Sequence, residues 1–181
     1  ITMIGSTNTA KKVFSDSSTS IKRLSMELGG NAPFIVFDDA DIKSAIDLAI
    51  GIKFGNSGQI CVAANRFFIH EKIYDRFLEG YLNRVKNLKL GFGENQNPDM
   101  GPLITSKSRD RILDLIDDTL KNGGKLEYGG KIPGNHPIGN WLEPTVITNI
   151  NDKMRIFNEE IFGPVASIMK FSSDEQVLAL A

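Results

Sequence analysis

Short apolar segments that resemble strands alternate with amphipathic segments that resemble helices along almost the whole chain of 181 residues. The apolar runs and their Gly, Pro and Ser boundaries predict strands at 1–5, 21–28, 33–37, 66–70, 125–130, 141–148 and 165–171. Helical spacing and capping residues predict helices at 7–16, 41–54, 71–89, 106–122 and 174–181, with a Gly- and Pro-rich loop at 91–103. This alternation predicts an α/β fold with an open, parallel-rich sheet and flanking helices.

The charge balance and the length of the apolar runs exclude several classes of protein. Lys and Arg number 21 against 22 Asp and Glu, a formal charge of −1, which argues against a nucleic-acid partner. No apolar run approaches the ~20 residues of a membrane span, and the first residues lack the order of a secretory signal. We therefore expect a cytoplasmic protein with no membrane partner. The single cysteine cannot form an internal disulfide, which fits a reducing compartment.

Cys61 lies in GNSGQICVAANR (55–66), at the junction between a glycine-bearing loop and an ordered segment. Glycines let a backbone approach a bound substrate, and main-chain N–H groups at such a turn can lower a thiol pKa and hold a developing oxyanion. The alternative is a small buried hydrophobe, which is the commoner fate of a lone cysteine. His70 and His136 lie in no context that marks a cysteine-protease base. Without HExxH or CxxC, no metal site is expected.

Glu27 ends an alternating apolar strand and is followed at once by Leu28, Gly29 and Gly30. The carboxyl ends of parallel strands face the crevice where ligands bind in open α/β sheets. Partial burial there would raise the pKa of Glu27 toward that of a useful general base. The alternative is a solvated carboxylate at a strand end.

Gly5, Ser6 and Thr7 occupy an expected turn from strand to helix. Main-chain N–H groups and a hydroxyl at such a turn can bind a phosphate. The same residues also make an ordinary helix cap, so the two interpretations stay open at this point.

Together these segments resemble the aldehyde dehydrogenase family, and they occur in the family's order. ELGGN at 27–31 is similar to its general-base motif, and GNSGQICVAANR at 55–66 to its nucleophile motif. GSTNTA at 5–10 resembles the segment that meets the cofactor pyrophosphate, although Ala10 stands where a glycine is usual. MGPLI at 100–104, PTVI at 144–147 and EEIFGPV at 159–165 resemble further signatures of the family.

The resemblance implies oxidation of an aldehyde to a carboxylic acid through a thioester on Cys61. The thiolate would attack the aldehyde carbon, hydride would leave for a nicotinamide, and Glu27 would deprotonate the water that hydrolyses the thioester. The Cys61 N–H would form half of an oxyanion hole, and the asparagine that usually completes it would lie outside this chain.

The resemblance also implies a binding site for NAD or NADP. Gly5 and Ser6 would lie near the phosphates, Leu28 and Gly29 beside the nicotinamide, and Glu160 on the nicotinamide ribose, with Phe162 close to the nicotinamide. For Glu159 a role as a surface charge is the better interpretation. For Phe162 plain core packing is the alternative.

The resemblance divides the chain into the last part of a dinucleotide-binding domain (1–27), a catalytic domain (28–171) and the start of a return segment (172–181). The chain begins at Ile1 and ends inside an expected helix at Ala181, so we expect a piece of a longer polypeptide. The full-length protein would form a homodimer or homotetramer. The 181 residues alone are expected to lack dehydrogenase turnover, because most of the cofactor domain would be missing.

The substrate remains open among aldehydes. The pattern CVxANR most resembles succinate-semialdehyde dehydrogenases, which favours a small aldehyde that carries a carboxylate. Those enzymes often have an arginine at the position of Gly55, and glycine cannot replace its bidentate contact. A general aliphatic or aromatic aldehyde is therefore the second interpretation. Relatives that transfer the thioester to coenzyme A need no carboxylate at position 27, and a non-enzymatic relative would lose Cys61 or Glu27.

Overall fold

A computed structural model describes residues 1–93, 97–136 and 138–181. The chain divides into two compact units, Ile1–Gly30 and Asn31–Ala181. Within the described residues, no helix is both long and apolar enough to cross a bilayer.

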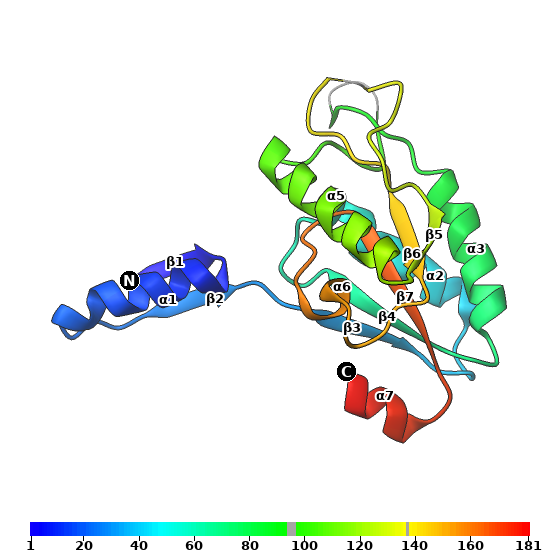
Figure 1. Ribbon diagram of the computed structural model, residues 1–181, viewed down its shortest axis with the longest axis horizontal. Helices are drawn as coiled ribbons and strands as arrows, with labels where there is room; N and C mark the ends of the chain where they lie inside the picture. Colours follow the sequence, from blue (N-terminus) through cyan, green and yellow to red (C-terminus); the bar gives the residue numbers. More distant parts are fainter. Residues whose placement is uncertain (94–96, 137) are drawn as a thin grey trace. The chain divides into compact units, whose positions relative to one another are not determined.

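The first unit is a strand, a helix and a second strand (Figure 1). β1 (Thr2–Gly5) and β2 (Ser25–Leu28) pair in parallel, with α1 (Thr7–Asp16) and a short 3-10 turn (Ser17–Thr19) between them. Ser6 caps α1 as expected, because its Oγ accepts the N–H of Thr9 at 3.2 Å. The strand predicted at 21–28 is shorter in the structure, since only its last four residues pair with β1.

The second unit is a five-stranded sheet with helices on both faces (Figure 1). The strand order is β3-β4-β7-β6-β5, in which only the pair β5 and β6 is antiparallel. Its strands are β3 (Ala32–Val36), β4 (Ala64–His70), β5 (Lys125–Tyr128), β6 (Thr145–Thr148) and β7 (Val165–Phe171). Its helices are α2 (Ile42–Phe54), α3 (Tyr74–Lys86), α5 (Ser106–Lys121), α6 (Arg155–Asn158) and α7 (Asp174–Leu180), with a 3-10 turn at Gly55–Gly58. The predicted α/β fold is confirmed.

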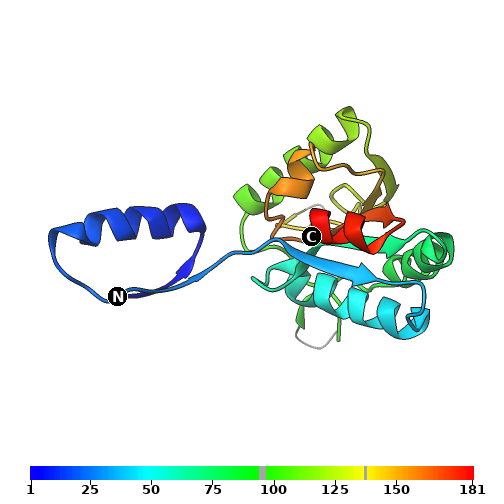
Figure 2. The same ribbon diagram turned by 90° about the horizontal axis from the view of Figure 1, so that it is seen from below.

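The two faces of the sheet bury separate hydrophobic clusters because successive strand residues point to opposite sides. On β4, Phe67 and Ile69 pack with α2 and α3, whereas Phe68 packs with α6 and α7. A third cluster fills the space between β6, β7 and α5, with Ile147 and Val165 as members. Figure 2 shows the resulting layers, with α2 on one side of the sheet and α5, α6 and α7 on the other.

Further predicted strands also differ from the structure. The run at 33–37 is parallel as expected, but β3 ends at Val36, and Phe37 after it is 38% exposed instead of buried. The strand predicted at 141–148 begins only at Thr145, because Pro144 before it has no N–H to donate to a sheet. The expected loop at 91–103 includes residues 94–96, which lie outside the described residues.

Candidate active site

The loop that carries Cys61 follows directly from the end of α2 and contains three successive left-handed residues. Asn56, Ser57 and Gly58 have φ values of 49°, 57° and 71°. They reverse the chain before a turn in which the N–H of Ala63 donates to the carbonyl of Ile60 at 3.0 Å. Cys61 lies in this turn and is exposed, so the alternative of a buried hydrophobe is wrong for this thiol. We call residues 55–61 the cysteine loop.

The segment MGPLI (100–104) holds the cysteine loop in place. The hydroxyl of Ser57, which is buried, donates to the carbonyl of Gly101 at 2.8 Å. The side-chain oxygen of Gln59 accepts the N–H of Ile104 at 2.9 Å. A sequence signature forty residues beyond Cys61 therefore fixes the backbone that presents the thiol.

The segment EEIFGPV (159–165) meets the cysteine loop at one edge of the sheet. β4 and β7 are parallel neighbours, with Arg66 opposite Ser167, so the segments that precede them lie together at their amino ends (Figure 1). A Cβ built on Gly58 would lie 2.2 Å from the carbonyl oxygen of Gly163. The structure therefore brings Cys61 and the segment of Glu160 and Phe162 to the same edge.

Replacing Gly58 by alanine should disrupt this contact. Its φ of +71° is unfavourable for alanine, and the added methyl group would overlap the backbone of Gly163. We expect a loss of about 2–4 kcal/mol in the free energy of unfolding and altered alkylation of Cys61 by iodoacetamide. Gly55→Ala is the matched control, because its φ of −52° suits alanine and its Cβ would meet nothing within 4 Å. Equal stability of the two variants would contradict the proposed contact.

The structure separates the two glutamates of EEIFGPV. Glu159 is paired with Arg155 at 2.9 Å on the surface, in agreement with its interpretation as a surface charge. Glu160 is half-buried, and its carbonyl accepts a hydrogen bond from Arg111 at 3.2 Å. Phe162 is 37% exposed with a φ of 48°, so plain core packing does not describe it.

The candidate residues of the first unit lie together at the carboxyl ends of its two strands. Glu27 pairs with Ile4 and Leu28 with Gly5, and Ser6 follows at the start of α1. The side chain of Glu27 is exposed, so the expected partial burial of this carboxylate is not found within the unit.

The entire chain, residues 1–181, matches the aldehyde dehydrogenase family. The protein is a member of this family. It is 43% identical to succinate-semialdehyde dehydrogenase [NADP(+)] 1 of Schizosaccharomyces pombe, over 100% of this chain and 36% of the relative. It is 39% identical to a betaine aldehyde dehydrogenase of Bacillus subtilis, over 100% of this chain and 37% of that relative. The chain thus spans little more than a third of the length of these curated relatives.

Solved structures of the family share the fold. A succinate-semialdehyde dehydrogenase from Burkholderia pseudomallei superposes with a TM-score of 0.95 at 40% identity, over 99% of this chain and 37% of that one. A betaine aldehyde dehydrogenase from Staphylococcus aureus in complex with NAD+ gives a TM-score of 0.95 at 35% identity, over 99% and 36%. The predicted membership of the aldehyde dehydrogenase family is therefore confirmed.

The chemistry of the candidate residues fits a nicotinamide dinucleotide. The first turn of α1 has N–H groups without partners inside the helix, which suits a phosphate next to Ser6. The carboxylate of Glu160 can accept the two hydroxyl protons of a ribose. Ala10, which stands where a glycine is usual in the family, is buried.

Neither histidine of the chain is placed as a partner for Cys61. His70 lies at the opposite end of β4 from the cysteine loop, where its Nδ1 accepts the N–H of Lys72 at 3.3 Å. His136 stacks on Trp141, with ring centroids 4.2 Å apart. No group of three His, Cys, Asp or Glu side chains able to hold a metal occurs in the described part of the chain.

Sequence reasoning missed two buried cations near the site. Arg66 donates to the carbonyl of Asn31 at 2.9 and 3.0 Å and to that of Leu180 at 2.8 Å, so it anchors the residue that follows ELGG. Lys53 lies in the last turn of α2 with its side chain fully buried. Lys53 follows Ile50, Ala49 and Ile46 by three, four and seven residues, so it lies on the apolar face of α2. This helical spacing is the sequence signal from which its burial could have been predicted.

Proposed function

We propose that this chain forms the catalytic part of an NAD(P)-dependent aldehyde dehydrogenase that makes carboxylic acids. The observation that carries the proposal is the exposed thiol of Cys61, held at the amino end of β4 beside the segment of Glu160 and Phe162. An enzyme that forms a thioester needs an accessible thiol next to the hydride acceptor. Residues 1–27 would be the last part of the cofactor domain, residues 28–171 the catalytic domain, and residues 172–181 the start of a return segment.

Each proposed step uses a residue of suitable chemistry. The thiolate of Cys61 attacks the aldehyde carbon, and its own N–H donates to the oxyanion that forms. A bound nicotinamide supplies the hydride acceptor. Glu27 then takes a proton from water, and the resulting hydroxide attacks the thioester and releases the acid. Relatives that transfer the acyl group to coenzyme A need no carboxylate at position 27. The presence of Glu27 therefore favours hydrolysis of the thioester by water.

The cofactor contacts are proposed residue by residue. Gly5 and Ser6 would contact the phosphates at the start of α1, and Leu28 and Gly29 would pass beside the nicotinamide. Glu160 would bind the hydroxyls of the nicotinamide ribose. Phe162 would lie close to the nicotinamide ring and limit the space around it, which fits the exposure of its side chain.

We propose succinate semialdehyde as the first substrate to test, and an uncharged aliphatic or aromatic aldehyde as the second. The names of several relatives support the first, and the arginine missing at Gly55 supports the second. A homodimer or homotetramer is proposed for the full-length protein. A cytoplasmic location also stays a prediction, since the relative from rice is named as mitochondrial.

A panel of aldehydes tests the function and its substrate together. We expect the full-length protein to reduce NAD or NADP in the presence of an aldehyde, and comparison of the two cofactors gives its preference.

Gly55→Arg should lower the KM for succinate semialdehyde about tenfold and leave that for propanal unchanged, because a guanidinium binds a carboxylate in a bidentate manner. The first atom of the new side chain has room, since a Cβ at Gly55 meets nothing within 4 Å. Equal changes for both aldehydes would contradict recognition of a carboxylate at this position.

A further inference from the structure

Lys53 is a charged residue inside the hydrophobic core of the second unit. Its side chain is 0% exposed, and its neighbours on the same face of α2 include Ala49 and Ile50, both buried. Lysine is almost never fully buried unless it is paired, because an ammonium group loses its hydration. The burial of Lys53 therefore needs a partner that compensates for the charge.

The hydrogen-bond partner of Lys53 is a buried amide on β4. Its Nζ donates to Oδ1 of Asn65 at 3.1 Å, and Asn65 is itself 2% exposed. The main chain of Asn65 is fixed in turn, because its carbonyl accepts the hydroxyl of Ser167 on β7 at 2.5 Å. A neutral amide orients the ammonium group but supplies no opposite charge.

The opposite charge comes from Glu160. Burial lowers the pKa of Lys53 to about 7, and the carboxylate of Glu160 opposes that shift by favouring the charged ammonium. Arg111 holds the main chain here, through the carbonyls of Glu160 and Ile161. Lys53 therefore supplies a cation that acts on the carboxylate of Glu160.

Packing places Gly58 of the cysteine loop against both the end of α2 that carries Lys53 and the segment of Glu160. A Cβ on Gly58 would lie 2.9 Å from the carbonyl oxygen of Lys53 and 2.2 Å from that of Gly163. The end of α2, the cysteine loop and the EEIFGPV segment are thus in direct contact around Gly58. A lysine anchored here can hold the carboxylate of Glu160 relative to the loop that carries Cys61.

We propose that Lys53 is a positioning residue that holds the Glu160 carboxylate, oriented by Asn65, in the geometry that binds the nicotinamide ribose. This proposal rests on the proposed function, since it assumes that Glu160 contacts the cofactor. Lys53 does not touch the substrate or the reacting atoms. It acts through Glu160, and its loss should weaken cofactor binding more than it slows chemistry.

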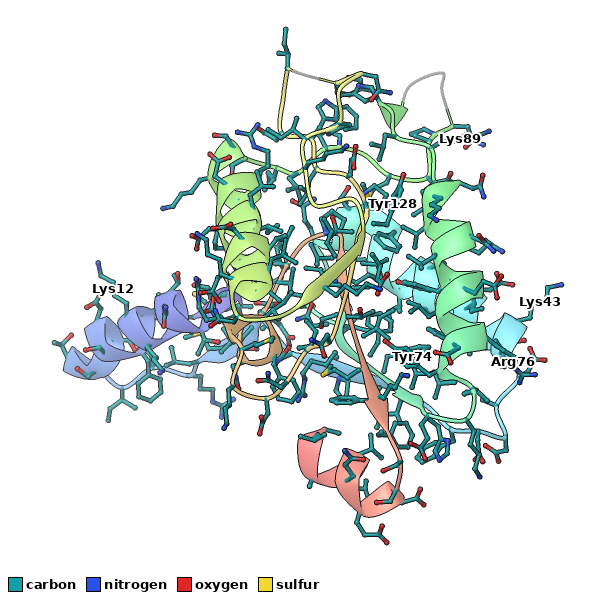
Figure 3. The ribbon with its side chains drawn as sticks, turned by 45° about the vertical axis from the view of Figure 1, so that its right-hand side comes forward. Lys12, Lys43, Tyr74, Arg76, Lys89 and Tyr128 are labelled. Atoms are coloured by element: carbon teal, nitrogen blue, oxygen red, sulfur yellow. The ribbon has the colours of Figure 1, made fainter. Side chains whose placement is uncertain are left out.

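The test compares Lys53→Gln with wild type in the full-length protein. We expect the dissociation constant of NAD+ or NADP+, measured by calorimetry without substrate, to rise about tenfold or more. The cofactor KM should rise by a similar factor, with a smaller change in kcat. Lys53→Arg should restore part of the affinity because it keeps the charge. Lys43→Gln is the matched control, since Lys43 is exposed at the start of the same helix (Figure 3).

A double variant separates positioning from a purely structural role. In a Glu160→Gln background, adding Lys53→Gln should change the cofactor dissociation constant by less than about twofold, since the carboxylate that Lys53 holds is already gone. A full tenfold effect in that background would overturn the proposal. So would wild-type affinity in a folded Lys53→Gln variant. Lys53→Met, which places no polar group of its own in the core, is the second variant if Lys53→Gln is unstable.

Failure of this proposal differs from failure of the proposed function. If the wild-type protein oxidises aldehydes and Lys53→Gln binds cofactor normally, only the positioning role is wrong. If the wild-type protein neither binds a nicotinamide dinucleotide nor oxidises any aldehyde, the proposed function fails and the role of Lys53 falls with it.

Discussion

Replacing Cys61 by alanine should remove aldehyde-dependent formation of NADH or NADPH by at least about 10⁴-fold in the full-length protein. Alanine has no nucleophile, so no thioester can form. Because the side chain of Cys61 is exposed, the free energy of unfolding should change by no more than about 0.5 kcal/mol. A coupled measurement of turnover and of urea unfolding on the same preparation would check both expectations.

Cys61→Ser is the matched variant for this test. A hydroxyl has nearly the same size as the thiol but is far less ionised at neutral pH, so turnover should also fall by several orders of magnitude. Substantial turnover of Cys61→Ala would show that another group forms the covalent bond, or that hydride leaves directly from the hydrated aldehyde. Either result would overturn the assignment of Cys61.

Replacing Glu27 by glutamine should lower steady-state turnover by about 10²–10⁴-fold, the usual contribution of a general base. Glutamine keeps the shape and the hydrogen-bonding capacity of the side chain but cannot accept the proton from water. Hydrolysis of the thioester would then become the slow step. Rapid mixing should reveal one equivalent of NADH or NADPH formed quickly, followed by a slow phase.

Glu79→Gln is the control for Glu27, because Glu79 is an exposed carboxylate on α3. Its turnover should equal that of the wild type. If Glu27→Gln instead retains full steady-state turnover, another base activates the water. If the rapid phase is lost as well, Glu27 acts on the thiol of Cys61 before the aldehyde binds.

The elements of the fold were predictable where the sequence pattern is local. The helix at 7–16 is capped by Ser6 and that at 42–54 by Asp41, as capping residues before periodic apolar positions predict. The predicted strand boundaries were wrong where they depend on hydrogen bonding to a neighbouring strand. Residues 21–24 lack a partner strand and Pro144 lacks a donor, and neither effect is visible in a hydrophobic pattern.

The site was less predictable than the fold, because its geometry depends on contacts between distant segments. The sequence places Cys61 after a glycine-bearing loop, but it does not reveal that Gly58 lies against Gly163. Nor does it reveal that this site lies at the amino ends of β4 and β7, whereas open α/β sheets usually bind ligands at the carboxyl ends. The spacing of Lys53 on α2 is a local signal of its burial. Its partners, Asn65 and Glu160, are on other elements and cannot be found from that spacing.

The pairing of β4 with β7 has a consequence for biosynthesis. The hydroxyl of Ser167 bonds to the carbonyl of Asn65 across a separation of 102 residues, and the support of the cysteine loop by Gly163 is of the same long range. A ribosome that adds about 5–20 residues each second leaves the thiol without this support for several seconds after Cys61 is made. During that interval the nascent chain should be open to oxidation and to aggregation through the unpaired edge of β4, so its yield should depend on chaperones and on a reducing environment.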